Sequence, residues 1–394
     1  MGIVLFDGVA HQQLLPLTYT KPVAALRVGI FTIQEKWNHY LGAETSIRTK
    51  DYLTEKFEGN NAKTEIGVFA GLLPDEDIVD TINNLEENQL LMHNDQVIAI
   101  CPLPAVEDMN DAIAKMTVLK YEGDLNIINR PWDIFKLNGE ELEKDFEIVK
   151  AEKESEEIEA SNTVIGNSVF IEKGAKVTCS ILNSTTGPIY IGKNAEVMEG
   201  CMIRGGFALL ENAVLKMGAK IYGPTTIGSF CKVGGEVGNS VMQGYSNKGH
   251  DGYMGNSVIG EWCNLGADTN TSNLKNNYGS VKVWSYKEET LIDSEEQFCG
   301  LIMGDHSKCG INTMFNTGTV IGVSANIFGS GFPRNFIPSF SWGGANGQST
   351  YKLNKVFEVA EIVMSRRKIE LDDTEKKILE NIFENTTQYR SWEK

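Results

Sequence analysis

A six-residue rhythm of aliphatic and small residues runs along the chain from about residue 164 to residue 337. An aliphatic residue recurs, a glycine or another small residue often follows it, and a further small residue comes four positions after the aliphatic one. Hexapeptide repeats are typical of a parallel β-helix, in which three repeats build one triangular coil of roughly 18 residues. We expect the aliphatic side chains to stack inside the solenoid and the small residues to permit its tight corners. Instances are Ile165 with Val169, Ile191 with Ala195, Ile227 with Cys231, Ile259 with Cys263 and Ile321 with Ala325.

Two segments break this rhythm, at residues 245–251 and 272–297. The first is rich in Gly, Asn and Ser, and the second is longer and carries Lys275, Lys282 and Trp284. Segments that leave a repeat scaffold often carry its function. We therefore expect both to be loops that project from the coils.

The region before the repeats lacks the rhythm. Residues 2–6 and 97–101 are apolar runs typical of buried strands, and residues 31–40 and 78–91 space their apolar side chains as amphipathic helices do. This mixture predicts a compact α/β domain over residues 1–150.

The remaining boundaries follow from charge and from a second helical pattern. Residues 151–162 are strongly charged and are expected to form a solvated connector. The β-helix is placed at 163–345, and residues 346–394 are expected to form helices. Asp372 and Glu375 are spaced as a capping pair for the second of these helices. We expect the helices to cover the open edge of the last coil.

Composition narrows the function classes. The 394-residue chain has 53 acidic and 36 basic residues, a net charge of −17, which argues against a nucleic-acid partner. The sequence has neither a signal-peptide pattern nor an apolar run long enough to span a membrane, so we expect a cytoplasmic protein without a membrane partner. The seven cysteines form no metal-binding pairs, and several occupy the small inward position of the repeat, so we expect buried free thiols.

The sharpest cluster of reactive residues lies at 248–273. It contains Lys248-Gly249-His250, then Tyr253 and Gly255, then Asn264-Leu265-Gly266-Ala267, then Asn273. A neutral imidazole is suited to act as a general base near pH 7. Alone, His250 is best interpreted as a surface residue, but the surrounding pattern favours a catalytic role.

This cluster resembles the acetyltransferase half of the bifunctional glucosamine-1-phosphate N-acetyltransferase/N-acetylglucosamine-1-phosphate uridylyltransferase family. That family has a Lys-x-Gly-His-x-x-Tyr-x-Gly block, followed by Ile-Gly, Asn-x-Gly-Ala-x-Thr, an Asn and a loop lysine. The overall pattern is closest to a divergent bacterial branch. The resemblance implies a left-handed parallel β-helix and an active site formed between the subunits of a homotrimer.

The resemblance also implies a role for each matching residue. His250 is the general base that takes a proton from the sugar amine, and Glu236, about one coil earlier, orients it. The backbone at Gly266 and Ala267 lies beside acetyl-CoA. The residues expected to bind the amino-sugar phosphate are Lys248, Tyr253, Asn264, Asn273 and Lys282, with Lys275 as an alternative to Lys282.

Two family features have no match in this chain. The family has an aromatic residue after the second Asn, where this chain has Leu274. The family holds the sugar phosphate with an Arg and a Lys in coils before the histidine. Lys216, Lys220 and Lys232 are nearby candidates, and each is also interpretable as an ordinary solvated lysine.

The start of the chain resembles sugar-1-phosphate nucleotidyltransferases. It has Gly8 and the run Leu-Pro-Leu-Thr-Tyr-Thr-Lys-Pro at 15–22, but it lacks the Gly-x-Gly-Thr-Arg core of that family. Two interpretations remain open. Either Gly8, Thr18, Lys21 and Arg27 bind a triphosphate such as UTP, with Mg²⁺ on acids such as Asp7 and Asp95, or the domain only packs or regulates.

Three hypotheses for the whole chain follow. The favoured one is an enzyme of sugar-nucleotide biosynthesis that acetylates an amino-sugar 1-phosphate from acetyl-CoA and has a possible second, nucleotidyl-transfer activity giving UDP-N-acetylglucosamine or a similar product. The second is a nucleotidyltransferase whose β-helix is structural or regulatory. The third is a trimeric scaffold without catalysis.

Overall fold

The computed structural model describes residues 2–57, 65–106 and 108–393, and these fall into two compact units. The first unit comprises Met1–Leu14, Lys21–Leu26 and Phe31–Arg130. The second comprises Leu15–Thr20, Arg27–Ile30 and Pro131–Lys394. Two short segments of the N-terminal region thus pack with the solenoid.

The first unit is built on one mixed sheet of strand order β2-β1-β3-β5-β4-β6. The neighbours of β1 run parallel to it, whereas β5 pairs antiparallel with both β3 and β4. The strands are β1 Gly2–Phe6, β2 Ser46–Arg48, β3 Glu65–Phe69, β4 Gln89–His93, β5 Gln96–Cys101 and β6 Thr117–Lys120. The helices are α1 Ala10–Gln13, α2 Ile33–Leu41, α3 Asp51–Phe57, α4 Glu76–Asn83 and α5 Met109–Ile113, with a 3₁₀ turn at Val23–Ala25.

Most of the elements predicted in this unit are confirmed, and one is wrong in part. The strand at 2–6 and the strand at 97–101 appear as β1 and β5, and the helix at 31–40 appears as α2. The helix expected at 78–91 begins at Glu76, capped by the Asp75 side chain, but ends at Asn83. Residues 89–93 form β4 because Leu90 and Leu91 are buried between β5 and β6, and this sheet pairing outweighs their helical spacing.

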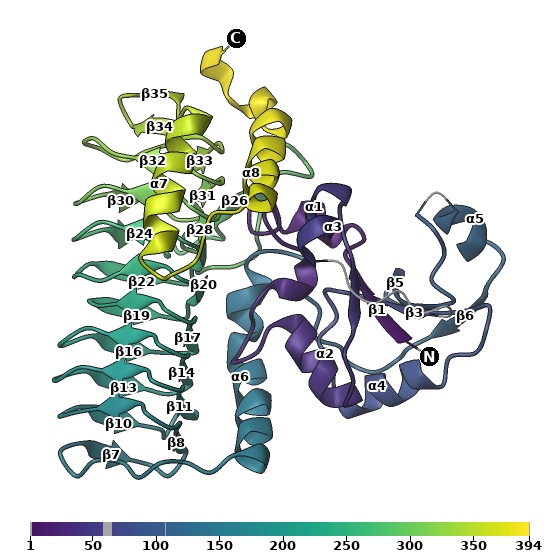
Figure 1. Ribbon diagram of the computed structural model, residues 1–394, viewed down its shortest axis with the longest axis horizontal. Helices are drawn as coiled ribbons and strands as arrows, with labels where there is room; N and C mark the ends of the chain where they lie inside the picture. The colour runs from purple at the N-terminus through teal and green to yellow at the C-terminus, as the bar shows by residue number, and fades with distance from the viewer. Residues whose placement is uncertain (1, 58–64, 107, 394) are drawn as a thin grey trace. The chain divides into compact units, whose positions relative to one another are not determined.

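The second unit contains a parallel β-helix of the left-handed type with three sheets, here called the first, second and third faces (Figure 1). The first face comprises β7 Thr163–Ile165, β10 Ile181–Asn183, β13 Met202–Arg204, β16 Lys220–Tyr222, β19 Glu236–Gly238, β22 Tyr253–Gly255, β25 Asn270–Thr271 and β30 Met314–Phe315. The second comprises β8 Val169–Ile171, β11 Ile189–Ile191, β14 Phe207–Leu209, β17 Thr225–Ile227, β20 Val241–Gly244, β23 Val258–Glu261, β28 Ile302–Met303, β31 Val320–Ile321 and β33 Phe336–Ile337. The third comprises β9 Lys176–Val177, β12 Glu196–Val197, β15 Val214–Leu215, β18 Lys232–Val233, β21 Asn247–Lys248, β24 Asn264–Leu265, β29 Lys308–Cys309, β32 Asn326–Ile327, β34 Ser341–Gly344 and β35 Gly347–Thr350.

The interior of the solenoid follows the repeat. The inward aliphatic residues Ile191, Ile227, Ile259 and Ile321 have no exposed surface. The exception is Ile165, which is 44% exposed because it occupies an outward position: it pairs in register with Asn183, whereas Val164 pairs with the buried Leu182. All seven cysteines are free thiols, and those at inward repeat positions are buried, as expected.

The first expected loop is instead a regular part of the coil. Residues 245–251 include β21, which pairs with β18 and β24 on the third face. The rhythm looks broken because this coil is shorter: Val214 pairs with Lys232, eighteen positions later, whereas Lys232 pairs with Asn247, fifteen positions later. The second segment does leave the solenoid, and it forms an antiparallel hairpin of β26 Lys282–Ser285 and β27 Thr290–Asp293.

Helices flank the solenoid along its side. The long helix α6 Asp133–Glu152 contacts β17, and Thr226 donates a hydrogen bond to Asn138. The C-terminal helices α7 Leu353–Ser365 and α8 Asp373–Asn385 also form, the latter capped by Asp372 as predicted, and two 3₁₀ turns follow at Thr387–Tyr389 and Ser391–Glu393. No helix in the described ranges is both long and apolar enough to cross a bilayer.

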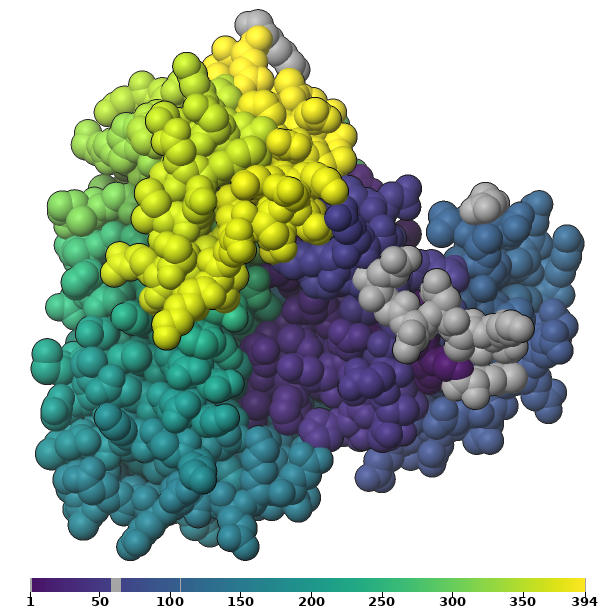
Figure 2. Space-filling model, viewed as in Figure 1, coloured from purple at the N-terminus to yellow at the C-terminus, as the bar shows by residue number. Residues whose placement is uncertain are grey.

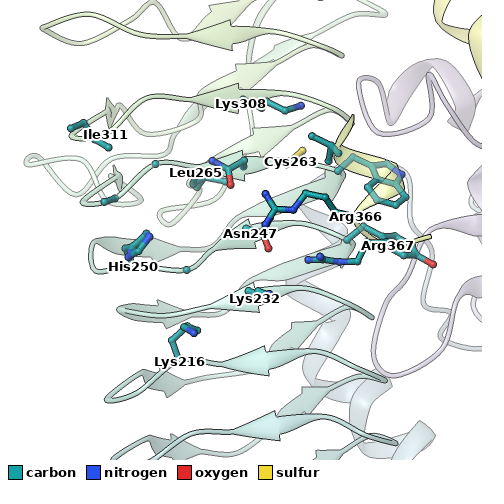
Figure 3. Close-up of a pocket in the computed structure, with 17 residues that line it drawn as sticks. Lys216, Lys232, Asn247, His250, Cys263, Leu265, Lys308, Ile311, Arg366 and Arg367 are labelled. Atoms are coloured by element: carbon teal, nitrogen blue, oxygen red, sulfur yellow. The ribbon is translucent and has the colours of Figure 1, made fainter. Parts of the chain in front are cut away.

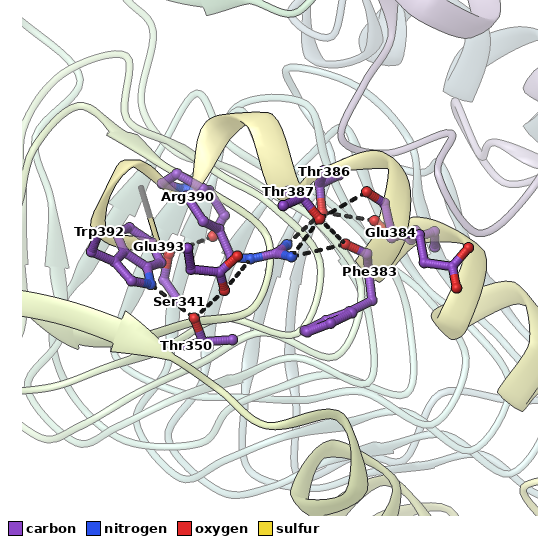
Figure 4. Close-up of polar contacts among 11 residues, drawn as sticks. Ser341, Thr350, Phe383, Glu384, Thr386, Thr387, Arg390, Trp392 and Glu393 are labelled. Atoms are coloured by element: carbon purple, nitrogen blue, oxygen red, sulfur yellow. Dashed lines mark hydrogen bonds and ion pairs between the residues drawn. The ribbon is translucent and has the colours of Figure 1, made fainter.

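The tail does not simply cap the last coil. Helix α7 lies on the side of the solenoid (Figure 2). There Ala360 and Met364 form a buried cluster with Trp262. The edge of the last coil on the third face is covered by β35, which pairs antiparallel with β34. The buried guanidinium of Arg390 ties the chain end together by donating to Glu393 and to the Phe383 carbonyl, while Trp392 donates to Thr350 of β35 (Figure 4).

Candidate functional site

A cavity of about 610 Å³ lies on the third face of the solenoid, and we call it the basic pocket (Figure 3). Five of its lining residues are lysine or arginine, and none of the described residues that line it is Asp or Glu. In a chain of net charge −17, this concentration of positive charge is a local exception that suits an anionic ligand. The cations are Lys216, Lys232, Lys308, Arg366 and Arg367.

The floor of the basic pocket is a ladder of outward side chains from successive coils. Lys232 pairs in register with Asn247, Asn247 with Asn264, and Asn264 with Lys308. Successive strand residues point to opposite sides of a sheet, so the next residue of each strand points inward. The repeat therefore places these polar side chains at fixed spacing on one surface.

One wall of the pocket is formed by α7 over a stack of aromatic rings. Phe230, Tyr245 and Trp262 occupy equivalent corners of successive coils with positive φ, and their rings stack at 5.2 and 4.2 Å. Helix α7 packs on this stack, so the two arginines that follow its last turn face the pocket. The Arg367 guanidinium also donates to the Phe230 carbonyl.

The stack of aromatic rings continues to His306 in the next coil. This histidine is at an outward position of the repeat, but it is 7% exposed and its ring stacks on Trp262 at 6.3 Å. It occupies the same left-handed corner as the aromatic residues below it. Burial on the stack explains why an outward repeat position is covered here.

The cations of the pocket perturb one another. The pKa of Lys232 is lowered, first by burial and then by the positive charges of Arg367, Lys216 and Arg366. Burial also lowers the pKa of Lys308 to about 8, and its ammonium donates to the His306 carbonyl. Clustered like charges of this kind are stabilised when an anion binds between them.

His250 lines the basic pocket together with Asn264, Gly266 and Ala267. It is exposed, at the corner between β21 of the third face and β22 of the first face. Lys248, predicted to contact substrate, is instead 1% exposed, and its ammonium donates to the carbonyls of Gly234 and His250. Burial lowers the pKa of Lys248 to about 8.

Tyr253 and Asn273 belong to a second polar group on the first face. Asn273 donates to the Tyr253 hydroxyl at 3.0 Å and to the Asn256 side chain at 2.8 Å. Glu236 pairs in register with Tyr253, and its carboxylate accepts a 2.7 Å hydrogen bond from Tyr222. The predicted residues therefore lie on both sides of the His250 corner.

Glu236 was expected to orient His250, and the structure gives it a different partner. Its carboxylate bonds to Tyr222 of the preceding coil, and burial followed by this bond raises the pKa of Tyr222. Lys282 is exposed on the hairpin, in register with Asp293, whereas the Lys275 ammonium donates to the Ser280 carbonyl within the same insertion.

The predicted nucleotide residues are divided between the units. Gly8, with φ of 51°, lines a cavity of about 600 Å³ in the first unit, the Gly8 cavity, and Lys21 is buried in that unit. Thr18 and Arg27 belong to segments of the second unit, where Thr18 is fully buried and the Arg27 backbone exchanges two hydrogen bonds with Gln243. The other lining residues of the Gly8 cavity include the side-chain amides of Gln13, Asn94, Gln96 and Asn129 together with Asp95 and Arg130.

The acids suggested for Mg²⁺ lie in different settings. Asp7 is buried and accepts hydrogen bonds from Thr49 and from the Val23 backbone, while burial raises its pKa to about 6. Asp95 lies in the turn after β4 and lines the Gly8 cavity. Within the described ranges, no group of three or more His, Cys, Asp or Glu side chains is arranged to hold a metal ion.

Besides Lys308, sequence reasoning missed two cations of the basic pocket, Arg366 and Arg367. They directly follow the apolar stripe of α7, so they read as the basic end of an ordinary amphipathic helix. A possible signal was the pair of adjacent arginines at the end of a helix expected to pack on the solenoid.

Comparison with known proteins supports the resemblance. Residues 3–154 match the family model of sugar nucleotidyl transferases. The bifunctional protein GlmU of Methanocaldococcus jannaschii is 33% identical over 208 residues, covering 53% of this chain and 44% of that protein. A bifunctional sugar-1-phosphate nucleotidylyltransferase/acetyltransferase of Sulfurisphaera tokodaii is 30% identical over 229 residues, covering 56% and 50%. The GlmU protein of Synechococcus elongatus is 26% identical over 199 residues, covering 49% and 36%.

Solved structures give a weaker likeness. An Arabidopsis UDP-N-acetylglucosamine acyltransferase matches at 17% identity and a TM-score of 0.29, covering 54% of this chain and 80% of that one. AntD, an N-acyltransferase from Bacillus cereus solved with dTDP and coenzyme A, matches at 13% identity and a TM-score of 0.22, covering 52% and 92%. These scores are too low to support an argument about this protein.

The expected bacterial branch is not supported, because the two relatives named above with at least 30% identity are archaeal. The chain spans about half the length of the curated relatives it matches. Residues 3–154 thus match the sugar nucleotidyl transferase family model, and about half of the chain is similar in sequence to bifunctional GlmU proteins.

Proposed function

We propose that the chain is an enzyme of sugar-nucleotide biosynthesis that transfers the acetyl group of acetyl-CoA to the amine of an amino-sugar 1-phosphate, with glucosamine-1-phosphate as the first candidate. The observation that carries the proposal is the basic pocket, where His250, Asn264 and the Gly266–Ala267 backbone meet five cations. A general base beside an anion-binding surface suits acyl transfer between two phosphorylated substrates. The relatives named above include an acetyltransferase.

The reaction assigns one step to His250. The sugar amine attacks the thioester carbonyl while the imidazole takes a proton from the nitrogen, so an N–C bond forms and the C–S bond breaks. The imidazolium then returns the proton to the departing CoA thiolate. The thioester is already activated, so holding the substrates in place and removing one proton suffice, without a covalent enzyme intermediate.

The two sides of the His250 corner suit the two substrates. The basic pocket carries the charges to bind the phosphates of coenzyme A, since lysine and arginine are the side chains that pair with phosphate. On the other side, Tyr253 and Asn273 offer a hydroxyl and an amide to the amino sugar. Lys282, or Lys275, is proposed to reach the sugar phosphate from the hairpin.

We further propose that the enzyme is a cytoplasmic homotrimer. The outward side of the first face exposes apolar residues, with Ile181, Met202 and Met314 between 38% and 45% exposed. A second subunit would cover such a surface. Light scattering coupled to gel filtration tests this assembly, and a monomer at micromolar concentration would contradict it.

A second activity is proposed for the first unit, namely transfer of a nucleotide from a triphosphate such as UTP to the acetylated sugar 1-phosphate, with Mg²⁺. The observation that favours it is the Gly8 cavity with its side-chain amides, which are suited to hydrogen-bond a nucleobase. Pyrophosphate release from UTP and N-acetylglucosamine-1-phosphate measures it. No release with any of the four common triphosphates would mean that the domain only packs or regulates.

The deciding experiment is thiol release from acetyl-CoA with glucosamine-1-phosphate, compared between the wild type and His250→Ala. Release by the wild type that the variant loses supports both the activity and its base. Full activity in a folded variant overturns the assignment of His250. Absence of release with a panel of amino sugars, and of CoA binding by calorimetry, would favour the scaffold hypothesis, whereas triphosphate turnover without any CoA dependence would favour a nucleotidyltransferase with a structural solenoid.

A further inference from the structure

Lys248 is a lysine at an inward position of the solenoid. It pairs in register with Val233, an apolar residue with no exposed surface, and Lys248 itself is 1% exposed. A buried ammonium group is costly unless its donors are satisfied. The hydrogen-bond partners of this ammonium therefore indicate what the residue does.

Both partners are backbone carbonyls at the corner between the third and first faces. The Lys248 Nζ donates to the His250 oxygen at 3.0 Å and to the Gly234 oxygen at 3.2 Å. Gly234 follows β18, the strand one coil before β21. A single ammonium therefore ties the corner that carries His250 to the corner of the preceding coil.

The two corners also pack backbone against backbone. A Cβ atom at Gly235 would lie 3.0 Å from the His250 oxygen and 2.9 Å from the Asp251 Cα, and φ at Gly235 is 75°. Glycine tolerates both the close approach and this conformation. The His250 corner thus packs directly against the backbone of Gly235, and Lys248 links the two corners by hydrogen bonds from inside the solenoid.

We propose that Lys248 is a positioning residue for acyl transfer, whose buried ammonium fixes the corner from which His250 reaches the acceptor amine. This inference rests on the proposed function of His250. It replaces the sequence-based expectation that Lys248 contacts the substrate, since its ammonium lies behind the corner on two carbonyls.

The two hydrogen bonds of the Lys248 ammonium, here called the clamp, give the reaction a distinctive pH dependence. Burial lowers the pKa of Lys248 to about 8, and the nearby carboxylates of Asp251 and Asp268 oppose this shift only in part. Above that pH the ammonium loses its charge, and a neutral amine is the weaker donor to a carbonyl. General-base catalysis by His250 alone predicts a plateau at high pH, so the clamp predicts a falling limb of kcat above about pH 8.

The test compares Lys248→Met with Val233→Ala, a matched control at the neighbouring inward position. Lys248→Met is expected to lower kcat by about 10- to 100-fold because a small displacement of a catalytic group costs this much. KM for acetyl-CoA and for the amino sugar should stay within about twofold, and the falling limb should disappear. Val233→Ala should lower the melting temperature but keep kcat and the limb.

Wild-type kcat in Lys248→Met would overturn the inference, as would a raised KM with unchanged kcat, which would indicate a substrate contact. If circular dichroism shows that Lys248→Met is unfolded, Lys248→Gln replaces it, and a falling limb that persists in Lys248→Gln would overturn the inference. Failure of the proposed function is distinguishable, because it appears as no acyl transfer by the wild type, or as full activity of His250→Ala, whatever Lys248 does.

Discussion

The basic pocket and the Gly8 cavity have nearly the same volume, about 610 and 600 Å³, and differ in the chemistry of their walls. The basic pocket contains five cations: three lysines in or next to strands of the third face, and two arginines that follow α7. The second is lined by four side-chain amides and four apolar side chains, together with Gly8, one acid and one arginine. Size therefore says little about what each site binds, whereas the charge and donor pattern predicts phosphates in one and an uncharged polar group in the other.

The largest effect is expected from His250→Ala. Loss of a general base lowers kcat for acyl transfer on the order of 10²- to 10⁴-fold, and turnover of UTP in the first unit should not change. Parallel thiol-release and pyrophosphate-release assays on one preparation measure both. An equal loss of the two activities would contradict the separation of the sites.

The next effect comes from the arginines after α7. Arg366→Gln and Arg367→Gln, each made singly, should raise KM for acetyl-CoA by about 10- to 100-fold with little change in kcat, since one charged hydrogen bond to phosphate contributes about 1.5–3 kcal/mol. Steady-state kinetics at low and high salt measure this. Lys376→Gln, which removes a half-exposed cation from α8, is the control, and an equal KM change in it would indicate a general charge effect.

A smaller effect is expected at the Gly8 cavity. The Gln13 side-chain oxygen is buried there without a hydrogen-bond partner in the described structure, so an uncharged donor on a ligand would satisfy it. Gln13→Ala should weaken UTP binding by about 5- to 10-fold, the worth of one neutral hydrogen bond. Calorimetry with UTP measures the change, and acyl transfer by the same variant should match the wild type.

The smallest effect concerns stability. The pKa of Lys248 is about 8 in the folded chain, below its ordinary value of 10.5, so the unfolded chain binds more protons between these pH values. The free energy of unfolding should therefore gain a stabilising contribution as pH rises from 8 toward 10. Denaturant titrations of the wild type and Lys248→Met measure it as a difference in slope. Identical slopes would mean that Lys248 is not buried with this pKa.

The solenoid was predictable because the hexapeptide repeat recurs from coil to coil. The inward residues Ile191, Ile227 and Ile259 are buried as expected. The shortened coil at Asn247 could not be predicted. A coil that is three residues short interrupts the repeat in the sequence just as a loop does, and only the strand pairing distinguishes the two. His250 and Asn264 stood out by local sequence. Arg366 could not be placed, because nothing local says that its helix packs on Tyr245 and Trp262 more than a hundred residues away.

The arginine wall of the basic pocket belongs to the tail and not to the repeat. Each coil is constrained by the coils on either side, so a substitution on the floor, such as at Asn247, must respect the spacing of two neighbours. Arg366 and Arg367 lie just beyond the last turn of α7, so the spacing of the coils does not constrain them. The identity of the bound anion is therefore the property of this solenoid most open to evolutionary change and to redesign, because a different tail can alter it while every coil stays the same.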